Sequence, residues 1–138
     1  MKKKWTVYCD GGARGNPGPA AAAFVVEEGG RAIHKEAKFL GEATNNVAEY
    51  KGVILALKWI SQRKKEMPEK IQFVLDSELV TKQLSGKYKI KNENLRNLYF
   101  SAKELENKIP SKVFYLNVER ERNRLSDFLV NKKLDEKR

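Results

Sequence analysis

Three apolar segments in the first forty residues predict an antiparallel meander. Trp5–Asp10 is rich in β-branched and aromatic residues and runs into a pair of glycines, which predicts a strand that carries Asp10 at its end, followed by a loop. Ala20–Val26 and Ala32–Leu40 have the same character, and a Glu-Gly-Gly-Arg turn stands between them. We therefore expect three consecutive strands joined by short connections.

The period of the apolar positions becomes helical from Val47 to about Lys64, and Asn46 is a suitable N-cap for this helix. Glu49 lies four residues before the apolar stripe begins. This spacing places its carboxylate at the head of the buried face and directs it toward the sheet, where a charged group requires an explanation. The stripe consists of Val53, Ala56, Leu57 and Ile60.

Strands and helices alternate in the second half of the chain, as is typical of α/β crossover units. Ile71–Leu75 predicts a buried strand with Asp76 directly after it, and Ser77 can cap a short helix that continues to Leu84. A longer helix, ended by Pro110, is predicted by apolar residues at spacings of three and four, namely Leu95, Leu98, Ala102, Leu105 and Ile109.

The last predicted elements are a strand at Lys112–Val118 and a helix from about Asn123 to Leu134, with Asp127 in or near its first turn. Together the elements predict one α/β domain over residues 1–138, with a basic N-terminus at 1–4, a tail at 135–138 and a mixed sheet that carries helices on its faces. Ligands of such sheets favour the carboxyl ends of strands. The residues predicted to face inward from the last helix are Leu125, Phe128 and Leu129.

Charge narrows the class of partner. The 138 residues include 28 Lys and Arg against 18 Asp and Glu, which gives a formal net charge of +10. Such a balance favours polyanionic partners, and charge alone leaves nucleic acid and anionic membrane both open. No apolar run approaches the ~20 residues of a membrane span, and the first residues lack the apolar stretch of a signal peptide. We therefore expect a cytoplasmic protein without membrane association.

The chemistry of a bound metal ion is also restricted by composition. One cysteine, Cys9, and one histidine, His34, exclude an intramolecular disulfide and a Cys/His metal site, so any metal ion must have oxygen ligands. Only four of the 18 acidic residues are aspartates. Two of these, Asp10 and Asp76, are expected at strand ends, and Mg²⁺ commonly binds through one or two carboxylates together with a substrate phosphate.

Each candidate acid also has an ordinary local interpretation. Asp10 could begin an Asx turn, Glu49 could close a capping box with Asn46, Asp76 could precede a helix cap, and Asp127 could complement a helix N-terminus. The alternative is that the four acids converge, because a tight carboxylate cluster is tolerated when cations neutralise it. Two such cations would suit a phosphodiester displacement in a basic protein that attracts phosphates.

Four segments resemble the type 1 ribonuclease H family, in the right order, over roughly residues 4–134. They are Tyr8–Ala20, Thr44–Glu49, Asp76–Val80 and Arg120–Asp127. The resemblance implies a five-stranded sheet in the order 3-2-1-4-5, which sets Asp10 beside Asp76. It also implies that the catalytic carboxylates bind two Mg²⁺ or Mn²⁺ ions and that the RNA strand of an RNA/DNA hybrid is cleaved to 5′-phosphate and 3′-hydroxyl ends. Those carboxylates would be Asp10, Glu49, Asp76 and Asp127.

The resemblance further implies a set of substrate contacts. The 2′-hydroxyl distinguishes RNA from DNA, and amide side chains suit its recognition because they both donate and accept hydrogen bonds. A phosphate of the DNA strand would be held by Thr44 and Asn92. The RNA riboses would be contacted by the loop Gly11–Asn16, with Gly11, Gly12 and Asn16 as the named residues, and by Asn45 and Asn46. Without the resemblance, Asn46 as a helix cap and Asn16 as a turn residue are equally ordinary roles.

The sequence departs from many relatives at three places. The loop before Asp127 lacks the histidine of many bacterial relatives, so Arg120 is the candidate replacement, with a solvated surface arginine as the alternative; the chain's one histidine is predicted to be structural. The basic segment Ser85–Lys91 is short beside the protrusion of some relatives. Glu42 and Val47 occupy positions where some relatives have arginine, which weakens the expected phosphate site.

We therefore expect a metal-dependent endoribonuclease that acts on RNA/DNA hybrids as a monomer, and the sequence indicates no protein partner. A broader specificity that includes double-stranded RNA is the first alternative, and a hybrid-binding module without catalysis is the second. A nucleotide-binding P-loop at Gly11–Gly18 is excluded because no Gly-Lys-Ser/Thr follows it.

Overall fold

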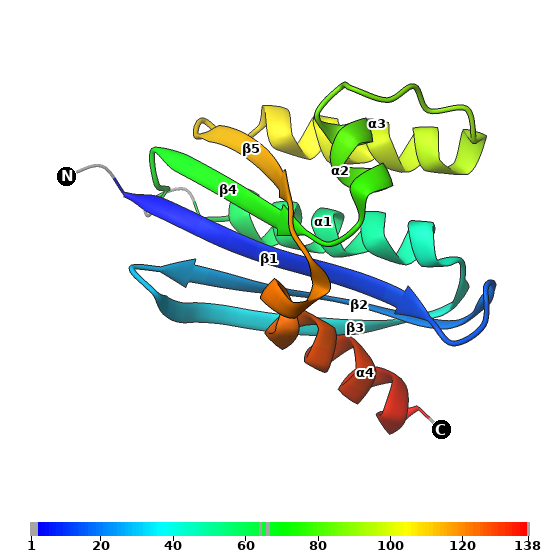
Figure 1. Ribbon diagram of the computed structural model, residues 1–138. Helices are drawn as coiled ribbons and strands as arrows, with labels where there is room; N and C mark the ends of the chain where they lie inside the picture. The colour runs from blue at the N-terminus through cyan, green and yellow to red at the C-terminus, as the bar shows by residue number, and fades with distance from the viewer. Residues whose placement is uncertain (1–2, 64, 66, 138) are drawn as a thin grey trace.

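The computed structural model describes residues 3–63, 65 and 67–137, and its centre is one five-stranded sheet in the order β3-β2-β1-β4-β5 (Figure 1). The strands are β1 (Lys4–Ala13), β2 (Gly18–Glu28), β3 (Arg31–Ala43), β4 (Lys70–Leu75) and β5 (Lys112–Asn117). The helices are α1 (Asn45–Ser61), α2 (Glu78–Leu84), α3 (Glu93–Asn107) and α4 (Arg124–Glu136), and a short 3₁₀ turn, η1 (Arg120–Arg122), precedes α4.

The sheet is mixed, as expected. β1, β2 and β3 form the antiparallel meander, whereas β4 runs parallel to both β1 and β5. The hairpin between β2 and β3 turns on Gly29 and Gly30, whose φ angles of +58° and +80° favour glycine and suit a two-residue turn. The predicted fold class and strand order are confirmed.

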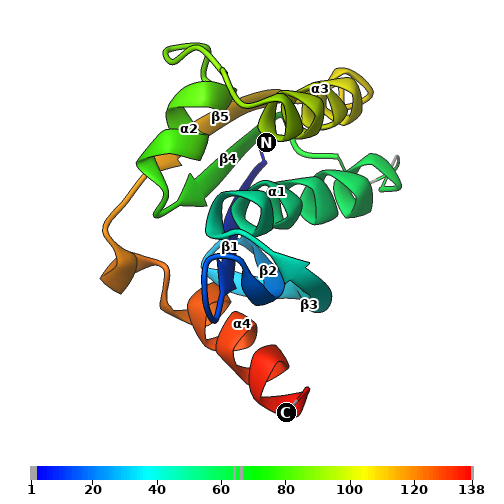
Figure 2. The ribbon, with the colours of Figure 1, turned by 90° about the vertical axis from the view of Figure 1, so that its right-hand side faces the viewer.

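The helices cover both faces of the sheet (Figure 2). α1, α2 and α3 lie on one side, and α4 lies alone on the other. The large core sits under α1, where all four residues of the predicted apolar stripe are buried together with strand residues such as Trp5, Phe24 and Phe73. On the opposite face, Val130 and Leu134 of α4 pack on Ala21 and Ala23 of β2, whose short side chains allow a close approach. Among the described residues, no helix is long and apolar enough to cross a bilayer.

Two details of the first half differ from expectation. β1 does not end at Asp10 but continues to Ala13, because the backbone of this segment keeps pairing with β2. The Asx-turn interpretation of Asp10 is therefore wrong. α1 begins two residues early: the side chain of Thr44 accepts a hydrogen bond from Val47 N and caps the helix, so Asn46 is not the N-cap and a capping box between Asn46 and Glu49 is wrong.

In the second half the boundaries agree within two residues, and Ser77 caps α2 as predicted. The orientation of α4 differs. Leu125 and Phe128 are 41% and 58% exposed, and only Leu129 of the three predicted inward residues packs on the core. The buried stripe instead consists of Ser126, Val130 and Leu134, spaced by four residues. α4 also continues to Glu136, into the expected tail, while the predicted helix end at Lys64 and the terminal residues 1, 2 and 138 lie outside the described residues.

Candidate active site

The candidate site forms where β1 and β4 separate. The two strands pair only as far as Tyr8 and Val74. Beyond that point β1 carries Asp10, which still pairs with β2 opposite Ala23, and β4 ends so that Asp76 follows its last residue. The two aspartates therefore stand on neighbouring strands at the opening between them.

Glu49 joins them because α1 crosses β1 at very short range. A Cβ atom on Gly11 would lie 2.1 Å from the carbonyl oxygen of Ala48, and one on Gly52 would lie 2.7 Å from that of Asp10. Only glycine permits such an approach of helix to strand. As a result, one carboxylate oxygen from each of Asp10, Glu49 and Asp76 lies within 4.8 Å of the other two.

Burial raises the pKa values of these carboxyl groups, so they are weaker acids than usual. Asp10 and Glu49 are 5% and 8% exposed. Desolvation, followed by the charge of Asp76, raises the pKa of Asp10 to about 7. Desolvation, followed by the charge of Asp10, raises the pKa of Glu49 well above its usual range. The pKa of Asp76 is also raised, mainly by burial, while the guanidinium of Arg120 opposes the shift.

Two oxygens of the cluster lack hydrogen-bond partners. Oε2 of Glu49 and Oδ2 of Asp76 are buried and accept no hydrogen bond from the residues that the structure describes. Nε of Arg120 lies 3.8 Å from Oδ2 of Asp76, beyond hydrogen-bond distance, and the arginine side chain is 77% exposed. Buried carboxylate oxygens without donors are costly unless a cation compensates them. The donor set therefore fits hard divalent cations such as Mg²⁺, which prefer oxygen ligands.

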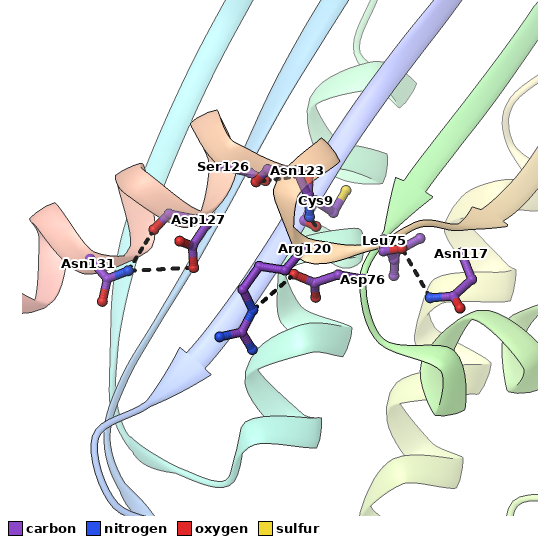
Figure 3. Close-up of polar contacts among 9 residues, drawn as sticks. All are labelled: Cys9, Leu75, Asp76, Asn117, Arg120, Asn123, Ser126, Asp127 and Asn131. Atoms are coloured by element: carbon purple, nitrogen blue, oxygen red, sulfur yellow. Dashed lines mark hydrogen bonds and ion pairs between the residues drawn. The ribbon is translucent and has the colours of Figure 1, made fainter.

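Asp127 lies in the first turn of α4, as predicted, and lines the same pocket as the other three acids. Its carboxylate is not part of the group within 4.8 Å. Asn131, one turn later, donates its amide to the carbonyl oxygen of Asp127 at 3.1 Å (Figure 3). The structure therefore brings together three of the predicted acids closely and places the fourth on the wall of the pocket.

The predicted RNA-contacting residues divide into two groups. Gly11, Gly12, Asn45 and Asn46 line the pocket with the acids. Asn16 does not line it; its Oδ1 accepts a hydrogen bond from the backbone N of Asn45 at 3.0 Å, and Oδ1 of Asn45 accepts one from Ala13 N at 2.9 Å. The two asparagines thus fasten the loop after β1 to the beginning of α1 through their amide oxygens.

Thr44 and Asn92, the predicted phosphate ligands, lie outside the pocket and cap helices. Thr44 caps α1, and Oδ1 of Asn92 accepts a hydrogen bond from Leu95 N at 3.0 Å at the start of α3. Val47 packs its side chain on the core, which explains an apolar residue there. His34 stacks on Trp59 with ring centroids 4.4 Å apart, outside the acidic pocket, in agreement with a structural role.

Ser77 and Asn131 also line the pocket and were not predicted as site residues from the sequence. Arg14, part of the loop Gly11–Asn16 that was expected to contact RNA, lines the pocket as well. Arg14 forms an ion pair with Asp135 at 2.7 Å and so ties the loop after β1 to the last turn of α4. The spacing of Asn131 four residues after Asp127 could have indicated its place on the same helix face. The ion pair of Arg14 with Asp135 had no such signal, because the two residues are at opposite ends of the chain.

Comparison with known proteins agrees with this geometry. The family model for RNase H matches residues 2–126. Ribonuclease HI of Halobacterium salinarum is 36% identical over 94% of this chain and 63% of its own length. A bifunctional protein of Mycobacterium tuberculosis is 37% identical over 96% of this chain. The chain spans only 36% of the length of that mycobacterial relative.

Solved structures give the same result. LC11-RNase H1 in complex with an RNA/DNA hybrid superposes with a TM-score of 0.91 at 34% identity, covering 96% of this chain and 97% of the other. RNase H1 of Halobacterium salinarum superposes with a TM-score of 0.88 at 35% identity, covering 96% and 98%. Since the family match extends over most of the sequence and the fold superposes over nearly the whole length of both chains, this chain belongs to the type 1 ribonuclease H family.

Proposed function

We propose that the chain is a metal-dependent endoribonuclease that hydrolyses the RNA strand of RNA/DNA hybrids and leaves 5′-phosphate and 3′-hydroxyl ends. The observation that carries the proposal is the cluster of Asp10, Glu49 and Asp76, in which one carboxylate oxygen from each residue lies within 4.8 Å of the other two. Two buried oxygens of these residues find no hydrogen-bond partner among the described residues. Family membership and the likeness to a relative solved with an RNA/DNA hybrid support the choice of substrate.

The carboxylates would hold two divalent cations, Mg²⁺ or Mn²⁺, with Asp127 as the fourth ligand group. When bound, these ions supply charge stabilisation for both the attacking and the leaving oxygen of the phosphodiester and lower the pKa of bound water. The protein itself orients the scissile phosphate over the gap between β1 and β4. In this proposal no side chain acts as a nucleophile.

Recognition of RNA would fall to the wall of the pocket around α1. The amide oxygen of Asn45 is engaged in holding the loop, so its amide nitrogen is the group that we assign to a ribose 2′-hydroxyl, while Asn16, which lies outside the pocket, would support the wall by holding Asn45. Asn46 and the backbone of Gly11 and Gly12 complete the wall.

The DNA strand would be held through a phosphate at helix N-termini. α1 and α3 both begin at the end of the molecule where β1 ends (Figure 1), and their caps are Thr44 and Asn92. Backbone N–H groups and the helix dipole favour an anion at such positions. The net charge of +10 would add a sequence-independent attraction to the duplex.

Arg120 is the candidate for the role of the missing loop histidine. It is exposed, lies in the turn before α4 and approaches Asp76, so it can reach a phosphate bound beside that carboxylate. We assign it to binding the substrate or product phosphate rather than to proton transfer, because a guanidinium stays protonated.

Cleavage assays with uniform duplexes test the proposal. The chain should cleave the RNA of an RNA/DNA hybrid with Mg²⁺ or Mn²⁺ and should be inactive in chelator, and Asp76→Asn should bind the hybrid but lose nearly all cleavage. Parallel assays on double-stranded RNA and double-stranded DNA decide between hybrid specificity and the broader alternative. Cleavage that persists without divalent metal, or wild-type turnover by the Asp76→Asn variant, would overturn the assignment.

A further inference from the structure

Asn123 is a buried polar residue between η1 and α4, with 1% of its surface exposed. Both the amide nitrogen and the amide oxygen of its side chain form hydrogen bonds. The amide nitrogen donates to the carbonyl oxygen of Cys9 at 2.8 Å, and Oδ1 accepts from the hydroxyl of Ser126 at 2.6 Å (Figure 3).

Both contacts lie next to carboxylates of the proposed site. Cys9 directly precedes Asp10 in β1, and Ser126 directly precedes Asp127 in α4. The carbonyl oxygen of Asn123 also accepts the backbone N–H of Asp127 at 3.2 Å. The side chain of Asn123 is therefore a direct polar link between the strand that carries Asp10 and the helix turn that carries Asp127.

The hydrogen bonds of Asn123 differ from those of an ordinary N-cap residue. Asn123 occupies the N-cap position of α4, and asparagine is among the preferred N-cap residues because its side chain can accept a helix N–H. Here no side-chain cap hydrogen bond is formed. The side-chain oxygen accepts from the Ser126 hydroxyl in place of a backbone N–H, and the amide nitrogen, which cannot cap a helix, donates to β1.

The same arrangement recurs at the second strand aspartate. The amide of Asn117 donates to the carbonyl oxygen of Leu75 at 3.3 Å, and Leu75 directly precedes Asp76 (Figure 3). Asn117, the last residue of β5, and Asn123, the residue before α4, thus each place an amide on the carbonyl that precedes a strand aspartate of the site. This repetition favours a role tied to the acidic site.

We propose that Asn123 is a positioning residue that sets the approach of Asp127 to the other three carboxylates. Asp10, Glu49 and Asp76 are fixed by the sheet and by the contact of α1 with β1, whereas Asp127 comes from a helix on the opposite face of the sheet. The inference rests on the proposed function of the four carboxylates as metal ligands. Residues that orient metal ligands commonly change metal affinity or activity 10- to 100-fold when they are replaced.

The test compares Asn123→Ala in the wild-type chain and in an Asp127→Asn background. Mn²⁺ affinity is measured by titration calorimetry, and kcat and KM are measured on an RNA/DNA hybrid. In the wild-type background we expect Mn²⁺ affinity and kcat to fall about 10- to 100-fold, with KM changed less than about threefold. In the Asp127→Asn background the same replacement should change Mn²⁺ affinity less than about threefold, because two residues that act as a unit are not additive.

A matched control and a second variant keep the test decisive. Ser111→Ala removes a side-chain hydrogen bond to the carbonyl of Pro68 at the far end of the sheet and should leave Mn²⁺ affinity and kcat unchanged. Asn123→Asp keeps the side-chain shape and the acceptor for Ser126 but removes the amide donor to Cys9, so it replaces Asn123→Ala if that variant does not fold.

Amide hydrogen exchange in the metal-free protein separates this inference from the proposed function. Loss of the link should speed exchange in the first turn of α4 at least about tenfold relative to its last turns, whether or not the protein cleaves RNA. If the wild-type protein neither binds Mn²⁺ nor cleaves the hybrid, the proposed function fails while exchange still reports on the link. Equal losses of Mn²⁺ affinity in the two backgrounds, or unchanged exchange in α4, would overturn the positioning role.

Discussion

Gly52 of α1 faces the backbone of Asp10 so closely that a Cβ atom at residue 52 would lie 2.7 Å from the Asp10 carbonyl oxygen. The contact is between backbones, so it cannot be relieved by turning a side chain. We expect Gly52→Ala to push α1 away from β1, to lower the free energy of unfolding by about 1–3 kcal/mol, and to reduce cleavage by moving Glu49 away from Asp10.

Urea unfolding and turnover measured on the same variant check this prediction. Gly12→Ala is the matched control for stability, because a Cβ atom there would meet only a side-chain methyl of Val130 at 3.8 Å, an ordinary contact. If Gly52→Ala were as stable as the wild type, the close approach would not determine the position of α1.

The metal-free protein should become less stable as the pH rises through the range where Asp10 titrates. Burial raises the pKa of Asp10 from 3.8 to about 7, so between these values the folded state binds more protons than the unfolded state, and stability falls with increasing pH. The whole loss is on the order of 4 kcal/mol for this one group.

Asp10→Asn removes this titrating carboxyl. With chelator present, the unfolding free energy of the variant minus that of the wild type should therefore increase from about pH 4 to pH 7. Thermal or urea unfolding at several pH values measures the difference. A difference that is independent of pH would show that the Asp10 carboxyl titrates normally in the folded protein.

Divalent metal ions should restore the stability that the metal-free protein loses at high pH. Cations bind deprotonated carboxylates, so Mg²⁺ or Mn²⁺ should raise the melting temperature at pH 8 and have much less effect at pH 5, where protons compete. At a free metal concentration one hundred times the Kd, the stabilisation is about 2.7 kcal/mol. Differential scanning calorimetry with and without metal checks this, and Asp76→Asn should remove most of the effect. The same stabilisation in that variant would place the metal site elsewhere.

The proposed phosphate contact of Arg120 can be tested with Arg122 as the control. If its guanidinium binds a phosphate beside Asp76, Arg120→Ala should lower kcat/KM about 10-fold or more, since a charge-assisted hydrogen bond contributes about 1.5–3 kcal/mol. Arg122 lies in the same exposed turn but does not line the acidic pocket, so Arg122→Ala should change kcat/KM less than about threefold. Equal effects of the two replacements would favour the alternative that Arg120 is a solvated surface residue.

The sequence was most informative where a period or a cap decided the structure. The apolar stripe of α1, the buried strand before Asp76 and the Ser77 cap are local signals, and the structure confirms each. Glu49 was correctly placed on the inner face of α1 because helix geometry fixes the direction of residues spaced by four.

The remaining features depend on partners that are distant in the chain. β1 continues past Asp10 because β2 supplies hydrogen bonds, although the glycines that follow resemble a loop. Leu125 and Phe128 of α4 face outward because the helix packs through Ser126, Val130 and Leu134 while it presents Asp127 to the pocket. Asn123 resembles an ordinary N-cap, and only its contact with Cys9 shows otherwise.

The hydrogen bond between Asn123 and Cys9 spans 114 positions of the chain. Contacts at such separation form late, since much chain entropy must be lost before they stabilise the fold. Three of the acids lie within the first 76 residues, whereas the fourth belongs to α4, after residue 123. Under the proposed function, a partly folded chain in which α4 has not docked would lack the complete set of metal ligands, and cleavage would require the docked helix.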